Sequence, residues 1–286
     1  MTWPSLPDPP EVAADQIGRG STRPRYEDVA QDGRVRMEGI WPAIGPILWG
    51  GGMPIARPFG RLGARGIRAV LTRAVLWGGP DPISVHNRTE HELRYELARA
   101  GERLLFDTWL ETHAPHRDGG REVLVARAYG QHVFTKPAAP PGEHRVTELD
   151  DPELPRVPRR EHVFLEALDL LALPDGAEPL EAELTPDAAV VAFGLAHTDG
   201  NQHVNFLAYP RLVEDAALRR MACLGFGSRM LARFAEVGYK KPCFAGDSMQ
   251  VLMRAFRHPE GFGVVAAFSP EPNARPHVTV RLLLSQ

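Results

Sequence analysis

Three side chains with complementary chemistry lie close together between residues 199 and 203. Asp199, Asn201 and His203 occupy alternate positions, so an extended backbone would direct all three side chains to the same side. A carboxylate can take a proton from water, a carboxamide can hold that water, and an imidazole can donate a proton or polarise a carbonyl group. The spacing therefore predicts a site for general acid–base chemistry.

A helix is expected to begin shortly after these residues. Residues 187–196 have the composition of a strand, and residues 208–225 carry apolar side chains on or near one helical face. The first N–H groups of a helix lack intrahelical acceptors and lie at the positive end of its dipole. A carboxylate beside such an end, with an imidazole and a carboxamide within reach, can activate water and stabilise an oxyanion, which is the outline of an acyl-transfer site.

Two proline-rich stretches divide the chain. Residues 1–25 are expected to form an extended N-terminal arm, and residues 137–160 a stiff linker. Between and after them lie an N-terminal domain at 26–136 and a C-terminal domain at 161–286. Both domains show a similar order of elements, a strand, a central helical segment and an antiparallel meander, which predicts a duplication of one α+β topology.

The expected strands follow β-branched and alternating patterns. They cover residues 34–41, 66–77, 82–98, 103–114 and 121–134 in the first domain, and 187–196, 228–239, 247–258, 262–270 and 274–284 in the second. The central segment of the first domain, 42–53, contains Pro46 and the glycines from Gly50 to Gly52. Because proline and glycine weaken helices, we expect a short or broken helix there.

The string from Asp199 to Tyr209 resembles a known active-site motif. Its pattern Asp-x-Asn-Gln-His-Val-Asn, followed by a tyrosine, is similar to that of the hotdog-fold thioesterase superfamily. The resemblance is closest to the acyl-acyl-carrier-protein thioesterases of plants and bacteria, which are tandem hotdog proteins, and looser to the 4-hydroxybenzoyl-CoA thioesterases. It implies an α+β double hotdog, with two antiparallel sheets each wrapped around a central helix.

The resemblance also implies an enzyme, an acyl thioester hydrolase of the EC 3.1.2 type. Such an enzyme converts an acyl-CoA or acyl-carrier-protein thioester to free acid and thiol, and the resemblance implies no metal and no cofactor. Asp199 would be the base or nucleophile, Asn201 would hold the carboxylate and the water, and His203 would polarise or protonate. Asn205 and Tyr209 would contact the substrate. The backbone amides from His203 to Asn205 would receive the oxyanion.

The chain departs from the family pattern at three places. The motif lies in the second domain, whereas the plant relatives carry it in the first. Pro242 stands where those enzymes carry a further catalytic glutamate. The equivalent turn of the first domain, expected at residues 41–45, offers no acid or histidine. We therefore expect one active site per chain, with the degenerate first domain as its partner wall.

The first domain can still supply the pocket for the acyl chain. Trp49, Met53 and Phe59 are the candidate lining residues. Burial of an acyl chain against such side chains would contribute ~0.8 kcal/mol per methylene. The same three residues could instead belong to the hydrophobic core.

Composition excludes several classes of partner. The net charge of −3, with both signs interspersed, provides no broad cationic field, so nucleic acid is not expected to bind. We find neither a secretory leader nor a long uncharged apolar stretch, which predicts a cytoplasmic chain without a membrane partner. Cys223 and Cys243 are too few for a disulfide framework. A homodimer is compatible with these features, because paired hotdogs bind acyl thioesters between subunits.

Other interpretations of these residues stay open. Asp199 and Asn201 could cap the helix, or Asp199 could bind a metal together with His197 and His203. A double hotdog could also act as an acyltransferase, decarboxylase or dehydratase of a polyketide or fatty-acid pathway, or as a non-catalytic acyl-thioester binding module. Neither cysteine has a histidine beside it in the sequence, so no reactive thiolate is expected.

Overall fold

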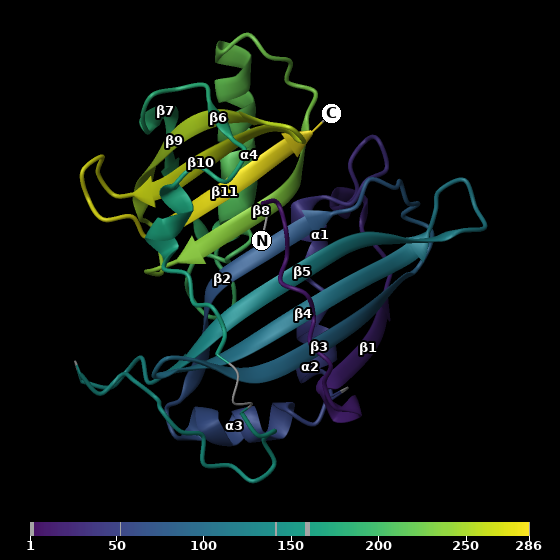
Figure 1. The fold of residues 1–286 in the computed structure, drawn as a ribbon, viewed down its shortest axis with the longest axis vertical. Coiled ribbons are helices and arrows are strands. Elements are labelled where there is room, and N and C mark those ends of the chain that lie inside the picture. Colours follow the sequence, from purple (N-terminus) through teal and green to yellow (C-terminus); the bar gives the residue numbers. More distant parts are fainter. Residues whose placement is uncertain (1–2, 52, 141, 158–160, 286) are drawn as a thin grey trace.

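The computed structural model describes residues 3–51, 53–140, 142–157 and 161–285. Within these residues the main element is an 11-stranded antiparallel sheet in the order β1-β3-β4-β5-β2-β8-β11-β10-β9-β6, with β7 paired to β9 (Figure 1). The strands are β1 (Ile17–Thr22), β2 (Arg68–Gly78), β3 (Thr89–Ala100), β4 (Arg103–Pro115), β5 (Glu122–Thr135), β6 (Glu178–Pro179), β7 (Thr185–Ala192), β8 (Leu231–Tyr239), β9 (Ser248–His258), β10 (Gly261–Ser269) and β11 (Val278–Ser285).

The sheets of the two halves are joined edge to edge. β2 pairs with β8, in a register that runs from Arg73 opposite Gly238 to Trp77 opposite Phe234. At this joint Arg73 Nη2 lies 2.5 Å from Glu236 Oε1. The two sheets expected from the sequence are therefore parts of one continuous sheet.

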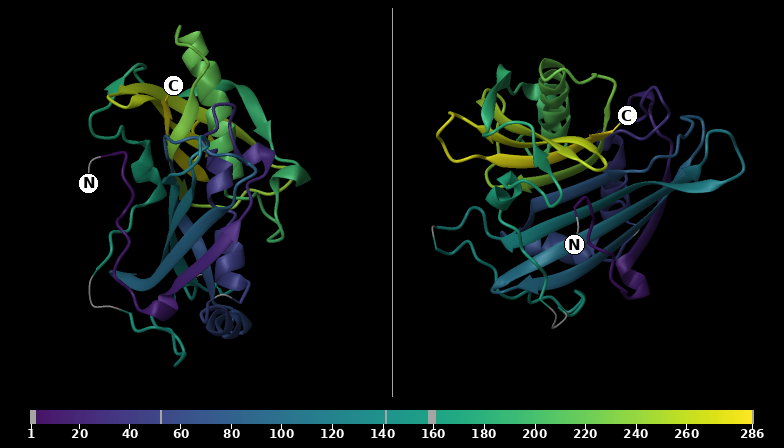
Figure 2. Two further views of the ribbon diagram at one scale, coloured as in Figure 1. Left: turned by 90° about the vertical axis from the view of Figure 1, so that its right-hand side faces the viewer. Right: turned by 45° about the horizontal axis from the view of Figure 1, so that its top comes forward.

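Helices cover one face of this sheet, as the side view in Figure 2 shows for α1, α2 and α4. The second half has a long helix, α4 (Ala208–Cys223), whose side chains Val213, Ala216, Ala217 and Met221 are buried against the strands. This face agrees with the apolar periodicity of the sequence.

The first half has a broken helix, as its glycines and proline predict. It consists of α1 (Met37–Ile40), α2 (Ile44–Trp49) and α3 (Ala56–Ala64), and Gly50 ends α2. Four short 3-10 turns complete the helical elements of the described chain: η1 (Ala14–Gln16), η2 (Tyr26–Asp28), η3 (Ala167–Leu171) and η4 (Leu195–His197). None of the described helices is long and apolar enough to cross a membrane.

The leading strand of the first half is not where the sequence predicts it. Residues 34–41 were expected to be a strand, but Met37–Ile40 in this range form α1. The strand is β1, which lies inside the expected arm 1–25 and pairs with β3 at the sheet edge. A Cβ at Gly18 would meet Ile47 at 2.6 Å, so glycine is needed where α2 approaches this strand. The domain boundaries at 26, 136 and 161 stay a prediction.

Candidate active site

The motif forms a closed loop between β7 and α4. Thr198 and Val204 make an antiparallel bridge, the Asp199 amide donates to the His203 carbonyl (3.2 Å), and the Gln202 amide donates to the Asp199 carbonyl (2.9 Å). Gln202 has φ of 65°, in the left-handed region. The loop is thus a tight turn, and the alternation expected for an extended backbone does not apply to Asp199, Asn201 and His203.

The Asp199 carboxylate is held by two donors. Its Oδ1 accepts the backbone N–H of Asn201 at 2.8 Å, and its Oδ2 accepts Asn205 Nδ2 at 3.0 Å. The other end of the Asn205 carboxamide, Oδ1, accepts the Leu207 N–H at 2.9 Å, directly before α4. Asn205 therefore ties the carboxylate to the start of the helix. This role was expected of the Asn201 side chain, which is exposed.

His203 is the third of the expected catalytic residues in this loop. Its side chain is half-buried, and Nδ1 lies 3.3 Å from the Val204 carbonyl oxygen. Asp199 is half-buried as well, so both groups can meet solvent. The structure brings Asp199, Asn201, His203 and Asn205 into one loop, as the sequence predicts.

Two of the three expected oxyanion donors already have backbone acceptors. The Val204 amide donates to the Cys243 carbonyl and the Asn205 amide to the His197 carbonyl, each at 2.8 Å. The amides of Val204 and Asn205 are therefore not free to receive the oxyanion, contrary to expectation, whereas this role stays a prediction for the His203 amide. α4 begins at Ala208, several residues beyond the motif. The His203 imidazole and the Asn201 carboxamide remain as polar groups that could face a developing negative charge.

Tyr209 lies beneath the loop and not at its surface. Its side chain is only 2% exposed, and its ring contacts Phe193, Tyr239 and Phe268 with centroids 5.8, 6.0 and 5.1 Å away. Burial, and then the neighbouring Cys243, raises the pKa of Tyr209. The structure does not support direct contact of Tyr209 with a substrate, because a core position leaves no open side.

A thiol and an imidazole also meet below the loop. Cys243 Sγ lies 3.6 Å from His277 Nδ1, a pair that the sequence does not reveal because the two residues come from neighbouring strand ends. Burial raises the pKa of the Cys243 thiol, whereas burial and then Lys241 lower the pKa of His277. Both directions favour the neutral forms. No histidine is beside Cys243 in the sequence, but the fold brings His277 to it, and a neutral thiol is still the expected state.

The first half supplies a wall beside the motif. The Trp41 ring, at the end of α1, contacts the Phe206 ring with centroids 5.0 Å apart. A Cβ at Gly130 of β5 would lie 2.4 Å from the Trp41 ring, so the ring rests directly on the strand backbone. Phe206 in turn accepts a hydrogen bond from Tyr239 Oη at its carbonyl (3.2 Å).

The candidate acyl-pocket residues separate into two groups. Trp49 and Phe59 line a cavity of about 400 Å³ between α3 and the ends of β2 and β5. Met53 does not line it, because this side chain is 3% exposed and packs under Gly18 of β1. The motif residues do not line this cavity either. Trp49 and Phe59 are thus available to an apolar ligand, and Met53 belongs to the core.

The first half contains a second copy of the motif loop that no sequence pattern reveals. Val29 and Val35 bridge as Thr198 and Val204 do, and both loops follow a short 3-10 turn. The Ala30 amide donates to the Arg34 carbonyl, and the Gly33 amide to the Ala30 carbonyl, which repeats the pattern of the second half. Gly33 has φ of 91°, in the left-handed region like Gln202.

The two loops differ in their chemistry. Counted from the bridges, Ala30 takes the place of Asp199, Arg34 that of His203, and Arg36 that of Asn205. The equivalent turn is therefore 29–35, and the expectation that it lies at 41–45 is wrong. Because Ala30 has no carboxylate, only the second loop offers a base at this position.

Clusters of three or more His, Cys, Asp or Glu side chains placed to hold a metal ion are absent from the described residues. His197 Nδ1 accepts the Gly194 N–H at 3.0 Å, which orients this imidazole toward its own turn.

Comparison with known proteins identifies the fold. No family model and no curated protein matches the sequence. Among solved structures, an acyl-ACP thioesterase from Bacteroides thetaiotaomicron has a TM-score of 0.56 at 16% identity, and covers 95% of this chain and 98% of its own. A 12:0-ACP thioesterase from Umbellularia californica has a TM-score of 0.58 at 12% identity, with 96% and 99% covered.

A protein described as an oleoyl thioesterase from Lactobacillus plantarum gives a TM-score of 0.62 at 13% identity, with 96% and 98% covered. At these identities the likeness concerns the fold. The chain has the double hotdog architecture that the motif and the internal duplication predict, over nearly its whole length.

Proposed function

We propose that this chain hydrolyses acyl thioesters to free acid and thiol, with Asp199 as the general base or nucleophile. The observation that supports this most directly is the held carboxylate. Asp199 accepts hydrogen bonds from the Asn201 amide and Asn205 Nδ2, and a carboxylate with about four acceptor positions then has room for a water molecule. The equivalent loop of the first half has Ala30 at this position, so of the two loops only the second has a carboxylate there.

The reaction proceeds in two steps in this proposal. Asp199 takes a proton from water while the water oxygen adds to the thioester carbonyl carbon, and the carbonyl electrons move to oxygen. When the carbonyl re-forms, the C–S bond breaks and the sulfur leaves as a thiol after it gains a proton. His203, in the same loop, polarises the carbonyl or donates that proton. If Asp199 attacks directly, an acyl anhydride forms first and water cleaves it.

The acyl group is placed against the first half. Trp41 meets Phe206 beside the motif, and the cavity at Trp49 and Phe59 has apolar walls. Each buried methylene would contribute ~0.8 kcal/mol to binding. The thiol carrier is CoA or an acyl-carrier protein, and the names of two similar structures specify ACP.

A non-catalytic acyl-thioester binding module is the second candidate. Pro242 favours it, because this residue stands where the resembling enzymes carry a catalytic glutamate and it has neither a carboxylate nor an N–H group. The buried, neutral Cys243 beside it does not replace an acid.

The test is thiol release from a panel of short, long and aromatic acyl-CoAs and acyl-carrier proteins. Wild type is expected to release thiol from at least one of them, and Asp199→Asn to lose ~10²-fold or more in rate, the scale of a general base. If neither protein releases thiol while an acyl-CoA still binds both, the hydrolase proposal fails and the binding module replaces it.

A further inference from the structure

The face of the sheet opposite the helices carries a separate feature. Residues 3–10 of the N-terminal arm run across this face, over strands of both halves (Figures 1 and 2). The segment reads Trp-Pro-Ser-Leu-Pro-Asp-Pro-Pro. Four prolines fix φ at their positions, so the segment is stiff and loses little conformational entropy when it docks.

The arm is held by aromatic side chains of the sheet. Trp109 Nε1 of β4 donates a hydrogen bond to the Pro7 carbonyl at 3.0 Å. At the other end, the Trp3 ring makes edge contacts with Phe234 of β8 and Phe256 of β9, with centroids 5.4 and 5.7 Å apart. The arm thereby contacts the first half through Pro7 and the second half through Trp3.

An apolar groove lies under the arm. Its buried members are Val75, Trp109, Tyr129, Phe234 and Leu283, and the arm residues Trp3 and Leu6 pack against them together with Trp77. Aromatic grooves in which an indole N–H bonds a carbonyl are a recurring way to recognise proline-rich segments. The groove and its occupant therefore fit this mode of binding in their chemistry.

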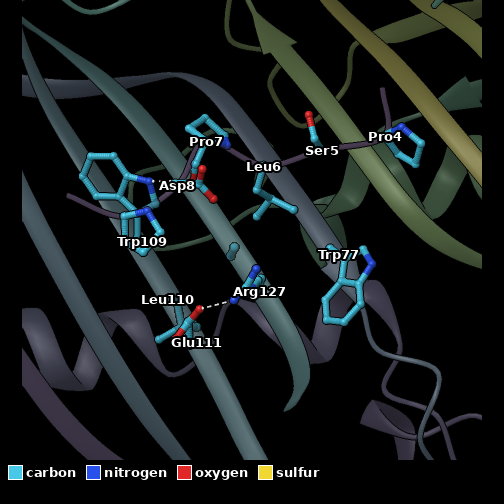
Figure 3. A pocket seen from close by; sticks show the side chains of 12 residues that line it. Pro4, Ser5, Leu6, Pro7, Asp8, Trp77, Trp109, Leu110, Glu111 and Arg127 are labelled. Atoms are coloured by element: carbon cyan, nitrogen blue, oxygen red, sulfur yellow. Dashed lines mark hydrogen bonds and ion pairs between the residues drawn. The ribbon is translucent and has the colours of Figure 1, made fainter. Parts of the chain in front are cut away.

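The arm does not fill the groove completely. A cavity of about 250 Å³ remains between the arm and the strands, with Trp77 and Trp109 at its sides and the Glu111–Arg127 ion pair (2.7 Å) at its floor (Figure 3). Trp3 Nε1 is buried without an acceptor among the described residues. Protein cores are packed to nearly crystalline density, so this interface is looser than a core.

We propose that this groove is an exchangeable binding site for the segment 3–10, occupied by the chain's own arm in the monomer and by the arm of a second copy in an arm-exchanged dimer. The contacts of the two forms are identical, so exchange needs no new interface. The segment 11–15 that joins the arm to β1 is mostly exposed and serves as the hinge. Its short length gives the cis arm an effective concentration of ~1 mM, so monomers prevail below this value.

The first experiment makes the arm separable after folding. A specific protease site is inserted between the exposed residues Ala13 and Ala14, and the purified chain is cleaved. The arm is expected to stay bound, to leave on dilution, and to be replaced by a fluorescent synthetic peptide of residues 1–12. Trp109→Phe, which removes the N–H donor but keeps a ring, should weaken peptide binding ~5-fold. Trp49→Phe, at an indole outside the groove, should leave it unchanged.

The second experiment tests whether the arm of a second copy of the chain occupies the groove. Sedimentation of the intact chain up to ~1 mM should show a dimer that grows with concentration, and Leu6→Asp should abolish it because a carboxylate cannot enter the groove. The proposal is overturned if the cleaved, still folded protein fails to bind the peptide at ~1 mM, or if the intact chain stays monomeric over this range. It is also overturned if Trp109→Phe and Trp49→Phe bind the peptide equally.

Discussion

At the scale of the residue, the central feature is a carboxylate whose direction is fixed by its own loop. Asp199 has two donors, and one of them, Asn205, also bonds the amide that precedes α4. A catalytic group is effective when its neighbours hold it before the substrate arrives. The placement of Asn205 makes the carboxamide a positioning group, and it distinguishes Asn205 from Asn201, which bonds through its backbone.

Asn205→Ala and Asn201→Ala should therefore behave differently. Loss of the Asn205 carboxamide removes a hydrogen bond to a charged group, a contribution of ~1.5–3 kcal/mol, so kcat should fall by ~10-fold or more. Asn201→Ala keeps the backbone N–H that Asp199 accepts and should cost much less. Steady-state thiol release of both variants measures this, with thermal unfolding as a check on folding. Equal losses would mean that the Asn201 side chain acts directly.

At the scale of the element, the sequence predicts the meanders and misses the first strand. The strands from β2 to β5 and from β8 to β11 were expected, because their alternating and β-branched patterns are long. Most bounds agree within a few residues, but β3 begins at Thr89 and the expected strand at residue 82. β1 carries the sequence Ile-Gly-Arg-Gly-Ser-Thr, and its order comes from pairing with β3 and from close packing of α2. Tertiary contacts of this kind leave no periodic signal.

For the candidate loop, too, the sequence predicts some features and misses others. The residues of the motif could be named from the sequence, but not their bonds, because the turn at Gln202 reverses the chain. The copy at 29–35 could not be found, since it shares backbone hydrogen bonds and hardly any side chains with the motif. The loops 29–35 and 198–204 thus share their backbone geometry but not the identity of most side chains.

The packing of β1, β3 and β4 around a buried histidine predicts acid sensitivity. His91 is 6% exposed and bonds Thr22 and Thr112 through its two ring nitrogens. Burial lowers the pKa of His91 to about 4. In the unfolded chain this imidazole binds its proton near pH 6.5. The contribution of neutral, buried His91 to the free energy of unfolding is therefore complete above that pH and is lost as the pH falls toward 4.

Chemical unfolding at pH 7 and pH 4.5 should show this loss, of ~2 kcal/mol for His91. His91→Gln should reduce the difference between the two pH values, whereas His86→Gln, at an exposed histidine, should not. An unchanged difference in His91→Gln would assign the acid sensitivity to other groups.

At the scale of the whole molecule, the continuous sheet depends on the joint between β2 and β8. Arg73 of β2 and Arg281 of β11 both approach Glu236, at 2.5 and 3.6 Å, and the Glu236 side chain is 4% exposed. One buried carboxylate thus forms ion pairs with two arginines where the two halves of the sheet meet. Removal of one member of such a group leaves buried charge without compensation.

Glu236→Gln should lower the free energy of unfolding by ~3 kcal/mol, measured by denaturant titration. Glu102→Gln is the matched control, because Glu102 pairs with Arg145 at an exposed position and should leave the midpoint almost unchanged. If both variants unfold alike, the joint owes its stability to strand pairing and apolar contacts alone.

The most direct test of the account is a comparison of two carboxylates in the two copies of the loop. Asp199→Asn and Asp32→Asn each replace one acid by its amide, in loops with the same backbone pattern. Thiol and free acid are measured in parallel on the best substrate of the panel. We predict that Asp199→Asn loses ~10²-fold or more in kcat while Asp32→Asn keeps the wild-type rate. Equal rates in wild type and Asp199→Asn would contradict the account.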